Sequence, residues 1–333
     1  MSAYEPLLDP YDRPHSNLRI SVTDRCNIRC FYCMPDESIV FKPKDEILTF
    51  EEIERFVRLL APVGVNKLRL TGGEPLVRAH LPDLISRLAA IPGIDDLALT
   101  TNGILLENQA QLLKDAGLQR INISLDTLSE ETFQRITRRS GLEQVLAGIA
   151  AAQEVGFEKV RLNAIAIRDL TENEVIPLGQ FARQHNLELR FIEFMPLDAE
   201  DQWQSDKVLS GDLIRQQLEE AFGTLEPVER VDSSQPAVDY QFADGGGHIG
   251  FINPVSQPFC SDCNRLRLTA EGQVRNCLFS TTEWDARELL RNDSDDQQIL
   301  DLVRDCIAHK KLAHGIDTEE FVKPARAMYQ IGG

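Results

Sequence analysis

The chain has 333 residues, of which 42% are hydrophobic and 26% are charged, a composition typical of a globular protein with one large domain and a smaller addition. The formal net charge of −18 argues against a general nucleic-acid-binding role, which needs a basic face. It also argues against an anionic membrane surface as a partner.

The N-terminal fifteen residues lack the apolar segment of a signal peptide. No apolar run approaches the roughly 20 residues that a helix needs to cross a bilayer. In such a chain, clustered cysteines indicate metal ligands in a reducing compartment rather than disulfides. We therefore expect a cytoplasmic protein without a membrane partner.

The first two thirds of the chain alternate between β-rich runs and helical patterns. The predicted strands are residues 17–22, 67–71, 96–100, 120–125, 160–167 and 188–194. The predicted helices are residues 50–60, 81–90, 107–115, 142–155 and 174–184, the last with Thr171 as N-cap and Glu174 three residues later. This alternation implies a parallel sheet. Six units fall short of a closed eight-unit barrel, so we expect an α/β fold built as an open, partial (β/α)6 TIM-like barrel.

A cysteine motif follows the first predicted strand. Cys26, Cys30 and Cys33 form a C-x3-C-x2-C run. A [4Fe–4S] cluster normally takes four cysteines, so three thiolates would leave one iron open to a small molecule. A structural zinc site with His15 as the fourth ligand is the alternative. The spacing alone leaves both metals open, because thiolates suit each of them.

Other distinctive residues also follow predicted strands. Thr71-Gly-Gly-Glu-Pro comes after the second strand and Thr101-Asn-Gly after the third, while Ser124 ends the fourth and Met195 follows the sixth. Functional groups of such barrels gather at the C-terminal strand ends. The motifs are therefore expected to converge on one mouth with the cysteine loop.

The alternating pattern loosens after about residue 205. An amphipathic helix is predicted at 204–222, and short β-like pieces broken by Pro, Ser and Gly follow. A hairpin is expected at 265–274, a solvated helix and loop at 288–301, and a helix at 301–311. We expect a barrel domain over residues 1–230 and a smaller α+β domain over residues 231–333.

A second cysteine set lies in this C-terminal part. Cys260 and Cys263 form C-x2-C and Cys277 follows, with His248 as a candidate fourth zinc ligand. Arg265 and Arg267 alternate, so both point to one face if they lie in a strand. Paired guanidinium groups beside an incomplete metal site suggest an anionic ligand. Cys306, the seventh cysteine, is interpreted as a small buried apolar residue.

The cysteine loop with Tyr32, together with Thr71-Gly-Gly-Glu-Pro, resembles the radical S-adenosylmethionine (SAM) enzymes. In that family three cysteines bind three irons of a [4Fe–4S] cluster, and SAM chelates the fourth, open iron. Leu18-Arg-Ile-Ser-Val-Thr-Asp-Arg-Cys, Phe259-Cys-Ser-Asp-Cys-Asn-Arg-Leu-Arg-Leu and the final Gly332-Gly333 closely resemble the GTP 3',8-cyclase family of molybdenum cofactor biosynthesis. The resemblance covers nearly the whole chain.

The resemblance implies two [4Fe–4S] clusters and SAM as cofactors, and it implies roles for individual residues. Cys26, Cys30 and Cys33 would bind the first cluster, and Cys260, Cys263 and Cys277 the second. Tyr32, Gly73, Ser124 and Met195 match SAM contacts, and Arg19, Arg69, Thr100, Arg161, Arg265 and Arg267 match GTP contacts. Gly332 and Gly333 would reach the active site. The family commonly has Lys at the position of Arg161. Here a planar guanidinium group therefore replaces the compact ammonium group of lysine.

The implied activity is that of a radical SAM lyase. It converts GTP to (8S)-3',8-cyclo-7,8-dihydroguanosine 5'-triphosphate. The implied partners are a low-potential electron donor of the flavodoxin or ferredoxin type and a downstream pterin-forming synthase as product acceptor; a homodimer is an open alternative to a monomer. A radical SAM peptide-modifying enzyme with an auxiliary cluster and a zinc-binding scaffold are the competing interpretations.

Overall fold

The fold is organised around one twelve-stranded sheet in the computed structural model, which describes residues 5–198, 203–292 and 294–332. The strands are β1 (Asn17–Ser21), β2 (Lys67–Thr71), β3 (Asp96–Thr101), β4 (Arg120–Ser124), β5 (Lys159–Ala166), β6 (Glu188–Glu193), β7 (Leu225–Pro227), β8 (Val238–Phe242), β9 (His248–Ile252), β10 (Arg265–Leu268), β11 (Gln273–Arg275) and β12 (Trp284–Asp285). Their order is β12-β11-β10-β1-β2-β3-β4-β5-β6-β9-β8-β7. The sheet is thus an open one, as predicted, in the part of the chain that is described.

The six predicted strands are confirmed as neighbours that run parallel to one another, from β1 to β6. The C-terminal part adds a further parallel strand at each side, because β10 pairs with β1 and β9 pairs with β6. Antiparallel hairpins then complete both edges. The domain boundary expected at residue 230 falls between β7 and β8, which pair with each other.

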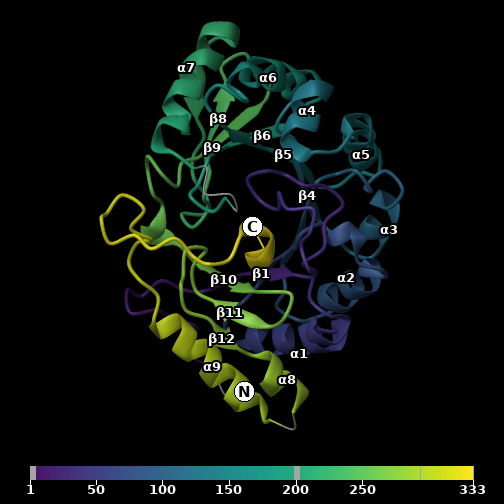
Figure 1. Cartoon of the computed structure of the whole chain (residues 1–333), viewed down its shortest axis with the longest axis vertical. Helices are drawn as coiled ribbons and strands as arrows, with labels where there is room; N and C mark the ends of the chain where they lie inside the picture. Colours follow the sequence, from purple (N-terminus) through teal and green to yellow (C-terminus); the bar gives the residue numbers. More distant parts are fainter. Residues whose placement is uncertain (1–4, 199–202, 293, 333) are drawn as a thin grey trace.

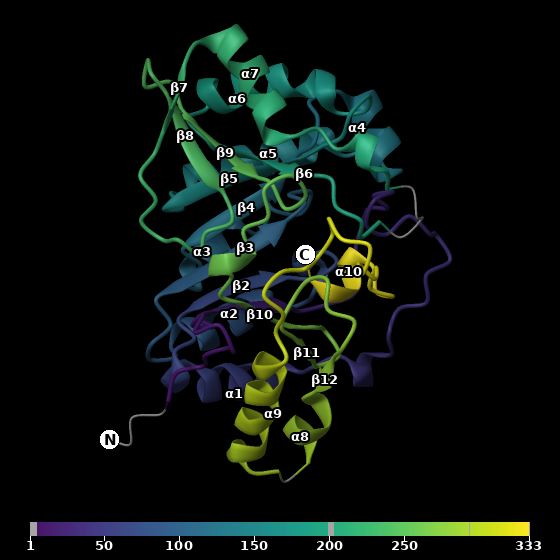
Figure 2. The same ribbon diagram turned by 90° about the vertical axis from the view of Figure 1, so that its left-hand side faces the viewer.

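The helices cover the outer face of the sheet, as Figures 1 and 2 show. They are α1 (Phe50–Leu60), α2 (Leu81–Ala89), α3 (Ala110–Asp115), α4 (Glu130–Thr137), α5 (Leu142–Glu154), α6 (Val175–Gln184), α7 (Gly211–Phe222), α8 (Arg287–Arg291), α9 (Asp296–Ala308) and α10 (Met328–Ile331). The short C-terminal helix α10 lies near the centre of the molecule in both views, unlike the others. None of the described helices is both long enough and apolar enough to pass through a membrane.

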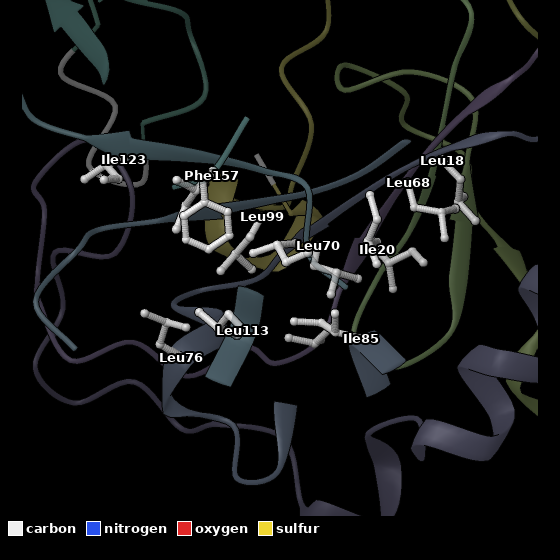
Figure 3. Packing of buried hydrophobic residues seen from close by; sticks show 14 of the residues in the cluster. Leu18, Ile20, Leu68, Leu70, Leu76, Ile85, Leu99, Leu113, Ile123 and Phe157 are labelled. Atoms are coloured by element: carbon white, nitrogen blue, oxygen red, sulfur yellow. The ribbon is translucent and has the colours of Figure 1, made fainter. Parts of the chain in front are cut away.

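The main core lies between the sheet and these helices. Leu18 and Ile20 of β1 and Leu68 and Leu70 of β2 are buried and pack in the layer shown in Figure 3. Successive side chains of a strand point to opposite faces. The residues between these leucines and isoleucines, including Arg19 and Arg69, therefore point away from the core and into the concave side of the sheet.

One local expectation is wrong. Thr171 does not cap α6, because its hydroxyl makes no capping hydrogen bond. It donates instead to the carbonyl of Ile165 at 2.8 Å and accepts from the amide of Ile167 at 2.9 Å. The hydroxyl that a capping motif would use is instead bonded to the backbone at the end of β5, and this local alternative competes with capping.

Candidate active site

A cavity of about 320 Å³ occupies the concave side of the sheet and is reached by both cysteine sets. Of the residues selected from the sequence, it is lined by Arg19, Cys26, Cys30, Tyr32, Cys33, Arg69, Gly73, Thr100, Ser124, Met195, Cys260, Cys263, Arg265, Arg267 and Cys277. Arg161 is not among the lining residues. Pro254, Phe259 and Phe279 add apolar surface to the wall.

The two cysteine sets lie at opposite ends of this cavity. Cys26 follows the C-terminal end of β1, whereas Cys263 precedes the N-terminal end of β10. Because β1 and β10 are parallel neighbours, these two ends point in opposite directions. The motifs expected to converge with the first cysteine loop all contribute to the wall of this cavity, and the second set adds a further wall at the opposite strand ends. The strand arginines lie between the sets rather than at a common rim.

The first cysteine loop is a compact turn. The amides of Cys33 and Met34 both donate to the carbonyl of Cys30, at 3.0 and 2.8 Å. Burial raises the pKa of Cys26 to about 11 and that of Cys33 to about 12. Burial likewise raises the pKa of Cys30. For Cys26, burial outweighs the charge of Arg29, which acts in the opposite direction.

The glycine run after β2 packs directly on this loop. The amide of Gly73 donates to the carbonyl of Thr23 at 2.8 Å. A Cβ at Gly73 would lie 2.4 Å from the carbonyl oxygen of Arg25, so no larger residue fits without moving backbone. Gly73 also lines the cavity. Its lack of a side chain serves both contacts.

Glu74 organises the next loop rather than facing a substrate. It is 1% exposed and accepts hydrogen bonds from Leu76 and Asn102 amides, at 2.9 and 2.7 Å, and from the Thr101 hydroxyl at 2.7 Å. Burial raises the pKa of Glu74 to about 7 despite these donors. Glu74 therefore orients both its own loop and the loop after β3.

Tyr32 is fixed by the carboxylate of Asp126, which was not among the site residues predicted from the sequence. Its hydroxyl donates to Asp126 Oδ2 at 2.6 Å, and Asp126 Oδ1 accepts from the amide of Ile165 at 2.8 Å. Asp126 therefore links the cysteine loop to β5. Burial raises the pKa of Tyr32, so the phenol remains the donor in this pair.

Three arginines stand side by side in the middle of the cavity. Arg19 is in register with Arg267 of β10 on one side and with Arg69 of β2 on the other. Neighbouring strands lie about 4.8 Å apart, and like charges directly opposite one another destabilise a sheet. Burial lowers the pKa of Arg19 and Arg69, and the adjacent arginines lower both further. The buried Nε of Arg19 has no hydrogen-bond partner, which favours an anionic ligand here.

Two further arginines belong to β5 and β6. Arg190 lines the cavity and pairs with Asp239 at 3.2 Å, while its buried Nε lacks a partner. Its position within a strand, as for Arg19 and Arg69, was a signal that could have identified it. Arg161 pairs with Glu188 and does not reach the cavity wall, so its proposed contact with GTP stays a prediction.

The second cysteine set lies among cations. Arg265 approaches Cys263 Sγ with Nε at 3.4 Å and Nη2 at 3.2 Å. Lys310 Nζ lies 3.4 Å from the same sulfur. Although burial opposes it, the charges of Arg265 and Lys310 lower the pKa of Cys263 to about 6. A thiolate, the form that binds metal, is therefore stabilised at this position.

The N-terminal segment holds this second set in place. Arg13 donates through Nη1 to the carbonyls of Cys260 and Leu312, at 2.6 and 2.9 Å. Its Nε is paired with Asp9 at 2.6 Å, and Asp9 also contacts His15 Nε2 at 3.3 Å. His15 Nε2 is thereby engaged with a carboxylate, and His15 is not among the residues that line the cavity with the first cysteine set.

The C-terminal tail enters the same region. The carbonyl of Gly332 accepts a hydrogen bond of 2.5 Å from Arg267 Nη1. Gly332 has a φ of +78°, and a Cβ there would lie 2.7 Å from Thr71 Oγ1. Only glycine suits this backbone and this space. Gly333 lies outside the described residues.

The donor chemistry of both sets fits iron–sulfur clusters. Each set offers three thiols, and no residue of either is in a disulfide. Among the described residues, no three His, Cys, Asp or Glu side chains converge on the position of one metal ion. A cube needs no such convergence, since each cysteine binds a different iron. His248 is exposed at the start of β9 and is not among the cavity-lining residues, so it does not complete the second set.

Sequence comparison identifies relatives along almost the entire chain. Residues 20–182 match the Radical SAM superfamily and residues 187–316 match the family Molybdenum Cofactor Synthesis C. The chain is 52% identical to GTP 3',8-cyclase of Rhodopirellula baltica, with 98% of this chain and 92% of the relative covered. It is 45% identical to the GTP 3',8-cyclase of Mycolicibacterium smegmatis, with the same coverage of both chains.

Structure comparison identifies the same fold in more distant proteins. Streptococcus suis SuiB bound to S-adenosylmethionine has a TM-score of 0.62 at 15% identity, covering 96% of this chain and 77% of that one. The protein anSMEcpe, with bound AdoMet and a peptide, has a TM-score of 0.58 at 14% identity, covering 94% and 93%. At such low identities the likeness concerns the fold alone, and it confirms the expected partial barrel.

Proposed function

The chain belongs to the GTP 3',8-cyclase family of the radical SAM superfamily, and we propose that it converts GTP to (8S)-3',8-cyclo-7,8-dihydroguanosine 5'-triphosphate, the first step of molybdenum cofactor biosynthesis. A [4Fe–4S] cluster and SAM are the cofactors of this superfamily. When bound, they supply a 5'-deoxyadenosyl radical that takes a hydrogen atom from C3' of GTP. The chain itself supplies binding, orientation and exclusion of water.

The observation that carries the proposal is the row formed by Arg267, Arg19 and Arg69. Three guanidinium groups in register on one face of a sheet repel one another, and burial makes their charges more costly. A triphosphate offsets both effects, since arginine pairs with phosphate through two parallel hydrogen bonds. The free Nε of Arg19 supports this assignment. Thr100 and Arg265 complete the proposed GTP contacts within the cavity.

SAM is placed at the end of the cavity that holds the first cysteine set. Cys26, Cys30 and Cys33 would bind the first cluster, and Tyr32, Gly73, Ser124 and Met195 would contact SAM. All of these line the cavity, which supports one shared site. The bond from Tyr32 to Asp126 keeps the ring next to the cysteines whether or not SAM is present.

The second cluster is placed at the other end, on Cys260, Cys263 and Cys277. Its open iron would face the guanine, while the arginine row holds the triphosphate. The cations around Cys263 support a thiolate there. Residues 231–333, which carry these cysteines, are proposed as the smaller domain added to the barrel of residues 1–230.

The tail is proposed to close the cavity near the reacting atoms. The packing of Gly332 against Thr71 and its bond to Arg267 support a role in excluding water from a radical. Gly333 is proposed to extend further in the same direction.

The electron donor is proposed to be a low-potential flavodoxin or ferredoxin that docks beside the first cysteine loop. Exposed Arg25 lies in this loop, and exposed Lys42 and Arg139 lie beside it, paired with Glu46 and Glu37 respectively. These cations would attract an acidic carrier even though the chain as a whole is acidic. Transfer of the product to a pterin-forming synthase, a homodimer and a cytoplasmic location remain proposals.

The test is an anaerobic incubation with SAM, reductant and GTP deuterated at C3'. Loss of one hydrogen from C3' and later gain of one electron and one proton leave a product isomeric with unlabelled GTP. We therefore expect a chromatographically distinct product that has lost the deuterium, and 5'-deoxyadenosine that has gained it. Deuterium-free 5'-deoxyadenosine would contradict the proposal.

The competing peptide-modifying reading has less support from this cavity, because a peptide does not need a row of buried arginines. A colourless protein with two bound zinc ions would instead support a zinc-binding scaffold. Anaerobically purified protein that is brown, with about eight irons per chain, supports two cubes.

A further inference from the structure

Lys310 is a buried cation that the proposed reaction does not use. It lies just beyond the C-terminal end of α9 and is 5% exposed. Its Nζ donates to the carbonyl of Arg265 at 3.0 Å and to Cys263 Sγ at 3.4 Å. Across the described ranges, the ion pairs of the protein include none between Lys310 and a carboxylate.

A buried ammonium is costly unless an opposite charge accompanies it. The sulfur of Cys263 is the group that can carry that charge, and Cys277 is close enough to raise the pKa of Lys310 as well. Lys310 is therefore matched to ligated, negatively charged sulfur rather than to a neutral thiol.

The first cysteine set has no equivalent of this arrangement. The side-chain donor near Cys26 Sγ is the neutral amide of Asn102, at 3.9 Å. Glu74 acts on Cys26 and Asp126 on Cys30, and the cation that also acts on Cys26, Arg29, donates to the backbone carbonyl of Cys26. The two ends of the cavity thus differ in whether a cation donates directly to a cysteine sulfur.

Lys310 also differs from Arg265, the other cation on Cys263. Arg265 lines the cavity and Lys310 does not. A bound ligand can draw Arg265 away from the sulfur, whereas Lys310 contacts the sulfur from outside the cavity lining. Its effect on the sulfur is therefore present in both the free and the bound enzyme.

We propose that Lys310 is a positioning residue that raises the reduction potential of the second cluster by donating a charged N–H to Cys263, so that the second cluster is reduced more easily than the first. This inference rests on the proposed function, because it assumes a cluster on Cys260, Cys263 and Cys277. Reduction adds one electron to the cluster, and a nearby cation stabilises the added negative charge. Hydrogen bonds to cluster sulfurs are known to set such potentials.

The test is an anaerobic redox titration of the full chain, reconstituted with iron and sulfide and followed by electron paramagnetic resonance. The second cluster is assigned in Cys30→Ala, which removes a ligand of the first. Lys310→Met is compared with Lys310→Gln, Lys310→Arg and Lys311→Met. Lys311 is the matched control, because it is the adjacent lysine and is exposed.

We expect Lys310→Met to lower the equilibrium constant for one-electron reduction of the second cluster at least tenfold, which corresponds to about 59 mV. Lys310→Gln should lie between Lys310→Met and wild type, Lys310→Arg close to wild type, and Lys311→Met at wild type. The first cluster should keep its potential in all four variants.

The inference is overturned if Lys310→Met and Lys311→Met have the same potential. If Lys310→Met loses the second cluster, the test uses Lys310→Gln and Lys310→Arg. A lower reduction potential in Lys310→Gln but not in Lys310→Arg supports the inference. Loss of the cluster in all three Lys310 variants shows that Lys310 has a structural role instead. If the wild-type protein holds only about four irons per chain, the proposed second cluster is absent and the inference is overturned together with it. A wild type with about eight irons and unshifted variants contradicts only the role of Lys310.

Discussion

Arg267 donates a hydrogen bond of 2.5 Å from Nη1 to the backbone carbonyl of Gly332, 65 residues further along the chain. Arg267 also belongs to the buried arginine row, in register with Arg19. The end of the chain is therefore tied to a residue of the proposed triphosphate site, and changes in the tail should be felt there.

Replacing Gly332 with Ala should impair cyclisation. The left-handed backbone at φ +78° costs a non-glycine residue about 1–2 kcal/mol, and the new Cβ would meet Thr71 Oγ1 at 2.7 Å. We expect a loss of at least about tenfold in product formation with SAM binding retained. Gly245→Ala is the control, since Gly245 has a φ of +77° but open space around it. Equal activities of the two variants in a product assay would show that the tail contact is dispensable.

Replacing Arg19 with Met should weaken GTP binding. Loss of one charge-assisted hydrogen bond costs about 1.5–3 kcal/mol, so affinity should fall roughly tenfold to a hundredfold. SAM binding should change little. Anaerobic titration with GTP and GMP measures this, and GMP should bind wild type far less well because it lacks the outer phosphates. Arg58→Met removes the same charge from the exposed face of α1 and should bind GTP normally. Tight GTP binding by Arg19→Met would make the row structural.

Replacing Cys30 with Ala should abolish cleavage of SAM even with a strong reductant. The first cluster loses one of its three ligands, and iron should fall from about eight to about four per chain. Cys306→Ala is the control, because Cys306 is buried in α9 away from the cavity lining. Iron analysis and detection of 5'-deoxyadenosine provide the measurement. Continued formation of 5'-deoxyadenosine would contradict the assignment of Cys30.

Replacing Cys263 with Ala should distinguish the functions of the two cysteine sets. The second cluster should be damaged while SAM still binds at the first. We expect weak, uncoupled SAM cleavage with little cyclised product, measured as the ratio of product to 5'-deoxyadenosine. Loss of SAM binding equal to that in Cys30→Ala would mean that both cysteine sets form one site.

The buried His15 should make stability sensitive to acid. Burial lowers its pKa from 6.5 to about 4, so the folded protein favours the neutral ring. This contribution to stability is present above pH 6.5 and is lost as the pH falls towards 4. Between pH 7 and pH 5.5 the loss should be about 1 kcal/mol. Urea unfolding at both pH values should show this component in wild type and in the exposed control His80→Gln, but not in His15→Gln. If His15→Gln loses as much unfolding free energy between pH 7 and pH 5.5 as the wild type does, the acid sensitivity comes from other groups.

Local patterns in the sequence were sufficient to predict the six strands from β1 to β6, because each has its own apolar run and turn. They were also sufficient to find the cysteines, whose spacing is short. The parallel pairing of β10 with β1 was not predictable in this way. It joins residues about 250 positions apart, and the local pattern of the four residues of β10, which predicts one arm of a hairpin, does not specify a distant parallel partner.

The site residues that were missed act through tertiary contacts. Lys310 reaches Cys263 across 47 positions, and Arg13 reaches Cys260 across 247. Neither carries a local motif, and an isolated lysine at a helix end is usually a solvated one. Asp126 was visible, but its partner Tyr32 lies 94 positions away. Thr171 shows the opposite problem, where a recognisable local motif was overruled by a nearby strand end.

The parallel pairing of β1 with β10 also fixes a length. The two cysteine sets are attached to opposite ends of strands that rise about 3.3 Å per residue, and a slip of one residue would turn every side chain to the other face. Hinge motion between domains therefore cannot alter the gap between the sulfurs without breaking the sheet. If both sets carry clusters, as proposed, a ligand that contacts both must extend from one end of the cavity to the other.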